Sequence, residues 1–170
     1  FTVVNSTTIT AVTTASQTSG IVAVTYSGGS SSSSSSLTMN SLPTITSSGS
    51  VNAVCSSSSA QSSTFNYTAS TNSPTSYSID WNATANTAGF MDVASTSHSF
   101  LAGGGSFSVP IGANVAPGVY SGVLSCTNAN GCIGTTTISL TITAIPTLSS
   151  VTQVAYACFS TQNISNNASI

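Results

Sequence analysis

The chain carries very few side chains that could perform acid–base or nucleophilic chemistry. Its only carboxylates are Asp80 and Asp92, and its only histidine is His98. Two carboxylates are in principle enough for a paired-acid hydrolase, but Asp80 directly precedes Trp81 in a strand-like stretch, which is typical of a turn or edge aspartate. A Ser–His–Asp arrangement around His98 carries no weight, because serine is so abundant that such coincidences are expected, and an exposed loop histidine is the simpler interpretation. We predict no catalytic site and no enzyme activity.

Metal and cofactor ligands are equally scarce. Calcium takes about six to eight oxygen ligands, usually several of them from carboxylates, and this chain has two carboxylates. The four cysteines, Cys55, Cys126, Cys132 and Cys158, do not follow a zinc-binding spacing. The sequence therefore predicts no metal site and no cofactor.

Aromatic residues offer one binding possibility. Tyr77, Ile79 and Trp81 alternate along "SYSIDW", so they share one face of a predicted strand. Trp81 and Tyr77 could form a stacking platform for a sugar, although a strand tryptophan in a β-sandwich more often packs into the core. Both interpretations stay open at this point.

The near-absence of charge restricts the partners. The chain has no Lys, no Arg and a net charge of −2, so it cannot neutralise phosphates, and nucleic-acid binding is not expected. Nothing basic could hold an anionic membrane surface, and no apolar run is long enough for a transmembrane helix, so we expect no direct membrane insertion. The start of the chain lacks a signal-peptide pattern, which favours a mature protein or a segment of one. Abundant Ser and Thr with few helix formers indicate an all-β, extracellular protein.

Two stretches of the chain repeat each other without a gap. "LTMNSLPTITSSGSVNAVC" (Leu37–Cys55) aligns with "LTITAIPTLSSVTQVAYAC" (Leu140–Cys158) at an offset of 103 residues. A period of this length is too long for a solenoid unit and suits a self-contained β-sandwich. We therefore expect residues 1–42 to be the C-terminal part of one repeat, 43–145 a complete repeat and 146–170 the start of the next.

The run of seven serines, Ser30–Ser36, looks like a flexible linker but occupies a different place in the repeat. The offset puts it over "IGTTTIS", residues 133–139, which leads into strand-like alternation. The run is therefore predicted to be a strand, and the linkers are placed at "SLPT" and "AIPT". Serine is a poor strand former, so two interpretations stay open. The run is either an exposed, weakly specified edge strand, or a stretch in which longer side chains were assigned as serine.

Strands in the complete repeat are predicted from alternating apolar residues between turn signals. They cover residues 50–55, 63–69, 76–81, 107–111, 118–128 and 133–142, with one helical turn within 82–89. Short strands separated by turns are the pattern of an immunoglobulin-like β-sandwich.

The complete repeat resembles the tandem immunoglobulin-like repeats of large cell-surface adhesins in Bacteroidota, including those of gliding motility. The resemblance rests on "SPTSYSIDW", "AGFMDV" and "VPIGANVAPGVYSGVLSCTNANGC" together with the "PT…C" start, and it covers residues 43 to about 145. It implies export, typically by type IX secretion, tandem arrays and a cell-surface location. Cys126 stands where such repeats usually have a strand residue such as Val or Thr.

In an exported protein the cysteines are expected to form disulfides. Cys158 is the repeat equivalent of Cys55, so its partner is expected beyond residue 170. Cys55 is then left to pair with Cys132, which we favour because it lies at a turn, or alternatively with Cys126. In the first case Cys126 would be a buried free thiol.

We expect a structural or adhesive role, as a stalk or adhesin built from tandem sandwich domains. Its partners would be neighbouring repeats, surface polysaccharide or other cell-surface proteins. The alternatives are a subunit of an extracellular filament assembled by strand exchange and a carbohydrate-binding module.

Overall fold

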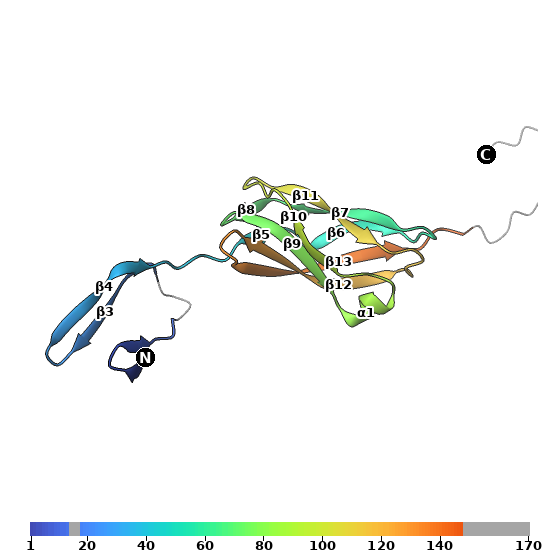
Figure 1. Ribbon diagram of the computed structural model, residues 1–170. Helices are drawn as coiled ribbons and strands as arrows, with labels where there is room; N and C mark the ends of the chain where they lie inside the picture. Colours follow the sequence, from blue (N-terminus) through green and yellow to red (C-terminus); the bar gives the residue numbers. More distant parts are fainter. Residues whose placement is uncertain (14–17, 148–170) are drawn as a thin grey trace, which may run out of the picture.

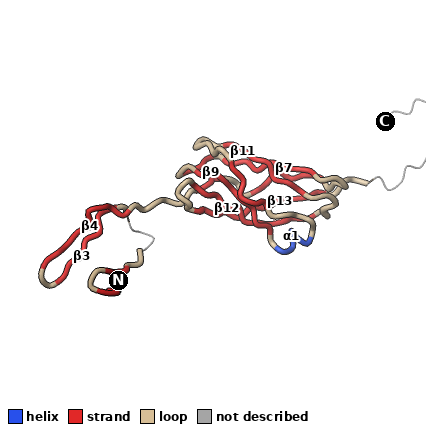
Figure 2. Tube along the Cα trace, in the orientation of Figure 1, coloured by secondary structure: helices blue, strands red, loops and turns tan. Residues whose placement is uncertain are grey.

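The computed structural model describes residues 1–13 and 18–147, and these residues form an all-β protein, as predicted (Figures 1 and 2). The elements of this part of the chain are β1 (Thr2–Asn5), β2 (Thr8–Thr10), β3 (Gly20–Tyr26), β4 (Gly29–Leu37), β5 (Thr44–Thr46), β6 (Ser50–Cys55), β7 (Gln61–Tyr67), β8 (Ala69–Thr71), β9 (Pro74–Trp81), α1 (Ala83–Thr87), β10 (Val93–Ser97), β11 (Gly105–Ile111), β12 (Gly118–Asn128) and β13 (Ile133–Thr143). The described residues contain no helix long and apolar enough to cross a membrane.

Residues 43–147, called here the core unit, are organised around one large mixed sheet. Its strand order is β10-β9-β12-β13-β6-β7-β11, and the short strands β5 and β8 pair separately. The neighbours that the register defines are antiparallel except β6 and β13, which run parallel. The sheet curls until it nearly forms a barrel. This curl brings β9 and β11 face to face, so that the rings of Tyr77 and Phe107 stack with centroids 4.1 Å apart.

The strands form where buried and exposed side chains alternate. Along β12 the buried positions fall on every second residue from Tyr120 to Asn128, and β13 buries Ile138, Leu140 and Ile142 in the same way. The helical turn predicted within 82–89 is confirmed as α1. Its N-cap is Asn82, whose Oδ1 accepts a hydrogen bond of 2.9 Å from the backbone N–H of Ala85.

All six predicted strands of the complete repeat are present, with ends shifted by at most a few residues. Three further strands, β5, β8 and β10, were not predicted. Each is short, and none has a regular alternation of buried apolar side chains. They add the two-stranded β5–β8 pair and one edge of the large sheet.

Residues 1–13 and 18–42 contain two hairpins, β1–β2 and β3–β4, which lie to one side of the core unit (Figure 1). The serine run lies in β4, so its prediction as a strand rather than a linker is confirmed. Hairpin β3–β4 falls on the repeat positions of β12–β13. Its side chains are exposed throughout, including Ile21 and Tyr26. A hairpin of this sequence therefore buries no core of its own.

Candidate functional site: the two ends of the core unit

The leading linker, residues 38–43, is fastened to the core unit through successive backbone carbonyls. Asn128 donates from Nδ2 to the carbonyl of Ser41 at 3.2 Å. Asn72 donates from Nδ2 to the carbonyl of Leu42 at 2.7 Å. The linker therefore meets the core unit as an ordered segment rather than as a loose tether.

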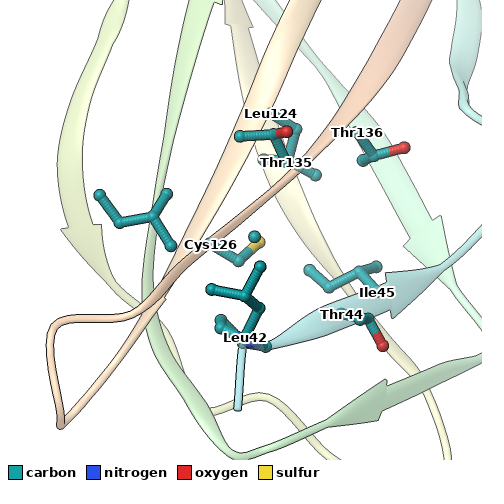
Figure 3. Close-up of a pocket in the computed structure, with 10 residues that line it drawn as sticks. Leu42, Thr44, Ile45, Leu124, Cys126, Thr135 and Thr136 are labelled. Atoms are coloured by element: carbon teal, nitrogen blue, oxygen red, sulfur yellow. The ribbon is translucent and has the colours of Figure 1, made fainter. Parts of the chain in front are cut away.

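The next residue of the linker is held by close packing. Pro43 is fully buried, and its carbonyl lies so near Gly134 that a Cβ atom at that position would overlap it. Figure 3 shows the continuation of this segment, from Leu42 to Ile45, beside Cys126 on β12. A pocket of about 320 Å³ lies between them. The start of β13 thus needs glycine because the linker passes directly over it.

Asn128 organises this end of the core unit. Its side chain is only 7% exposed. Its Oδ1 accepts from the backbone N–H groups of Asn130 at 3.1 Å and Cys132 at 3.0 Å, and the turn between β12 and β13 also places Gly131 at a φ of 76°. The buried side-chain amide of Asn128 therefore both stabilises the β12–β13 turn and hydrogen-bonds the linker. This role of Asn128 was not predicted, although the residue lies in "VPIGANVAPGVYSGVLSCTNANGC", one of the stretches on which the resemblance rests.

The predicted pairing of Cys55 with Cys132 is wrong for two cysteines of one core unit. Cys55 ends β6 opposite Thr143, the last residue of β13, whereas Cys132 directly precedes Ile133, the first. The strand between them spans ten steps of roughly 3.3 Å, while a disulfide needs Cα atoms within about 7 Å. Cys55, Cys126 and Cys132 are all free thiols.

The alternative pairing of Cys55 with Cys126 fails for the same reason. Cys126 pairs with Gly134 near the beginning of β13, far from Thr143. It is buried, and this burial raises the pKa of its thiol to about 12. Cys126 is thus a buried free thiol, a role predicted from the sequence together with the pairing of Cys55 with Cys132. Cys158, the remaining cysteine, lies outside the described residues.

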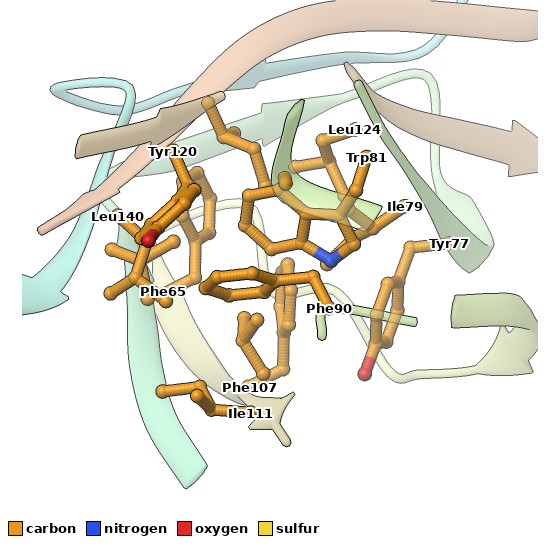
Figure 4. Packing of buried hydrophobic residues seen from close by; sticks show 14 of the residues in the cluster. Phe65, Tyr77, Ile79, Trp81, Phe90, Phe107, Ile111, Tyr120, Leu124 and Leu140 are labelled. Carbon is orange, nitrogen blue, oxygen red and sulfur yellow. The ribbon is translucent and has the colours of Figure 1, made fainter. Parts of the chain in front are cut away.

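Trp81 and Tyr77 are core residues, so packing into the core is confirmed and the alternative of a sugar-stacking platform is wrong (Figure 4). Trp81 is 2% exposed and packs on Phe90 with ring centroids 4.7 Å apart. Tyr77 is 7% exposed, and its hydroxyl donates to the carbonyl of Ser108 at 3.3 Å. Burial raises the pKa of the Tyr77 hydroxyl. Neither ring can stack on a ligand in solvent.

The remaining polar candidates have structural roles. Asp92 accepts a 2.9 Å hydrogen bond from the backbone N–H of Trp81 through Oδ1, while Asp80 points outward from β9. His98 is half-buried rather than fully exposed, and it packs edge-on against Phe100 with centroids 4.6 Å apart. Across the residues that the structure covers, no three His, Cys, Asp or Glu side chains gather where they could hold a metal ion.

No protein-family model and no curated protein matches the chain.

Proposed function

We propose that the chain is a segment of a long extracellular protein made of tandem immunoglobulin-like domains, which serves as a cell-surface stalk or adhesin. The observation that carries this proposal is hairpin β3–β4. It falls on the repeat positions of β12–β13, yet its apolar side chains have nothing to pack against. A hairpin with this sequence is expected to be the end of a preceding domain, whose other strands would be encoded upstream.

Three features of the core unit support an immunoglobulin-like sandwich. A buried tryptophan, Trp81, lies on an inner strand of the sheet, β9. Tyr120, near the start of β12, donates its hydroxyl to the carbonyl of Ala116 at 2.8 Å, which is the arrangement of a tyrosine corner. Parallel pairing of an early strand with the last one, here β6 with β13, joins the two halves of the large sheet.

The fastened linker supports a stalk in particular. A flexible linker would let neighbouring domains swing freely, whereas the contacts of Ser41, Leu42 and Pro43 fix the direction in which the chain enters the core unit. A low-charge, hydroxyl-rich surface without Lys or Arg suits an exported protein that must withstand trypsin-like proteases. The resemblance to Bacteroidota adhesins gives the same location, outside the cell.

A filament assembled by strand exchange is a second candidate, and one observation favours it. β13 pairs with β6 from Ser139 to its end at Thr143. The equivalent strand β4 stops at Leu37, just where pairing with an equivalent of β6 would begin. The repeat equivalent of β6 lies at residues 153–158, outside the described residues. In a filament, a second copy would supply this strand. A carbohydrate-binding module is not proposed, because Trp81 and Tyr77, the aromatic residues that could have formed a sugar platform, are buried.

The mass of the native polypeptide under denaturing, reducing conditions separates the two candidates. Peptide sequencing with a non-tryptic protease would accompany it, because the chain has no Lys or Arg. A polypeptide with many 103-residue periods is the expected result. A polypeptide near 16.8 kDa, the mass of this chain, would overturn the stalk and favour the filament.

A further inference from the structure

Two accessible thiols lie at opposite ends of the core unit, each beside the chain that joins it to a neighbour. At the C-terminal end, the Sγ atom of Cys55 lies 3.5 Å from Oγ1 of Thr143. The next residue, Ser56, donates its backbone N–H to the carbonyl of Thr143 at 2.8 Å. At the N-terminal end, the thiol of Cys132 donates to the carbonyl of Asn40 at 3.7 Å.

These two contacts involve equivalent residues of the repeat. Asn40 and Thr143 are 103 residues apart, so they occupy equivalent positions of successive repeats. Asn40 precedes this core unit in the same way that Thr143 precedes the unit that follows. In a tandem pair, the next unit's equivalent of Cys132 would lie against the carbonyl of Thr143. Cys55 already lies against the side chain of Thr143. One carbonyl has two lone pairs, so it can accept from Ser56 and from the incoming thiol together.

We propose that Cys55 of each domain forms a disulfide with the Cys132 equivalent of the domain that follows it. This proposal rests on the tandem array proposed above. It also accounts for two accessible cysteines that cannot bridge within one domain, because β13 separates them. Each junction would then be held by a covalent bond in addition to the fastened linker.

The bond forms by thiol–disulfide exchange with a disulfide-bearing oxidant. The thiolate of one cysteine attacks a sulfur of the oxidant and releases one oxidant thiolate. The second cysteine displaces the other oxidant thiolate from this mixed disulfide, so two thiols become one disulfide and two electrons and two protons pass to the oxidant. Cys126 takes no part, because it is buried under the linker and its thiol stays protonated.

The sequence also indicates which junctions carry the bond. Cys158 occupies the position of Cys55 in the following repeat, so that repeat can form the same disulfide with the repeat after it. The preceding repeat has Gly29 at the Cys132 position and therefore cannot receive a bond from the domain before it. Bridged and unbridged junctions would thus occur in the same array.

The first test is a non-reducing digest of the native protein after free thiols have been alkylated at mildly acidic pH. We expect a peptide containing Cys55 joined to a peptide containing Cys132 or its repeat equivalent. Such a link must cross a junction, because the same two residues are too far apart within one core unit. Alkylated Cys55 and Cys132 throughout the native protein would overturn the proposal.

The second test uses a chain in which residues 1–145 are followed by 43–170, so that the core unit occurs twice at its natural period. Cys158→Ser removes the extra thiol, and oxidised glutathione serves as the oxidant. We expect two thiols to disappear per chain. Cys55→Ser made in the first copy should abolish the thiol loss, whereas the same substitution in the second copy should leave it unchanged. Cys132→Ser should abolish the loss only when it is made in the second copy. Tryptophan fluorescence checks that every variant is folded.

The outcomes distinguish this proposal from the one on which it rests. Loss of thiols that does not depend on the copy carrying the substitution, or retention of all thiols in the folded double chain, overturns the disulfide while leaving the array intact. A native polypeptide with a single period overturns the array itself, and with it the bond between successive domains of one chain.

Discussion

Asn128 is the residue whose removal most directly tests how the linker is fastened. Its amide donates to the carbonyls of Ser41 and, more weakly at 3.4 Å, Asn72, and it accepts from two N–H groups of the β12–β13 turn. In Asn128→Ala, these groups lose their partner. The carbonyl of Ser41 and the N–H of Cys132 are the most costly to leave unpaired, because both of these well-formed bonds are part-buried.

The expected loss of stability follows from counting these bonds. A typical neutral hydrogen bond contributes about 0.5–1.5 kcal/mol net, and leaving a buried group unpaired costs about 1–3 kcal/mol. Water can replace the bond to Asn130, which lies in an exposed turn, and the 3.4 Å bond is marginal. Two effective bonds remain, so Asn128→Ala should lower the free energy of unfolding by about 1–3 kcal/mol.

Urea unfolding followed by tryptophan fluorescence measures this directly, because Trp81 is the only tryptophan and is buried in the core. The matched control is Asn130→Ala in the same turn, which removes an exposed side chain and should change stability by less than about 0.5 kcal/mol. Thermolysin should also cleave before Leu42 faster in the Asn128 variant. Equal stability of the two variants would refute the view that Asn128 fastens the linker.

Three further outcomes are expected. Gly134→Ala should destabilise the core unit by about 1–3 kcal/mol in the same urea assay, because the new methyl group overlaps the carbonyl of Pro43. The control Gly103→Ala, with open space around it, should be close to neutral. Equal effects of the two substitutions would contradict the close approach of Pro43 to Gly134. Iodoacetamide at pH 8 should label Cys55 in the reduced, folded chain but should label Cys126 only in denaturant, as measured by mass spectrometry. The reason is that burial raises the pKa of the Cys126 thiol to about 12 and only the thiolate reacts. Labelling of both cysteines in the folded chain would contradict the burial of Cys126. Tyr120→Phe should cost about 1 kcal/mol by losing one hydroxyl hydrogen bond, and an unchanged urea midpoint would argue against a tyrosine corner.

Much of the fold was predictable because its strands carry their own periodicity. β12 buries every second residue from Tyr120 to Asn128, and β13 does so from Ile138 to Ile142, so a single sequence locates them closely. β8 and β10 have no comparable pattern. β10 is almost wholly exposed and gains its place by pairing with β9, a tertiary contact that leaves no local signal.

The site was harder to predict because it depends on distances between parts of the chain far apart in sequence. The turn at Cys132 made a bridge to Cys55 look easy, but sequence spacing says nothing about which end of a strand each residue occupies. Asn128 gains its importance from Ser41, 87 residues earlier. Its position at the end of a strand, four residues before a cysteine and three before a glycine, was the available signal.

The parallel pairing of β6 and β13 has a further consequence if the ends of the core unit are pulled apart. The chain enters beside the start of β13, and β6 follows soon after, whereas the chain leaves from the end of β13 (Figure 1). Tension along the array would slide these two strands past each other lengthwise, so their ladder bonds would be loaded in shear and share the force. Strands peeled apart from one end would instead lose their bonds one at a time. The topology therefore places its strongest resistance to stretching along the axis on which successive domains would be strung.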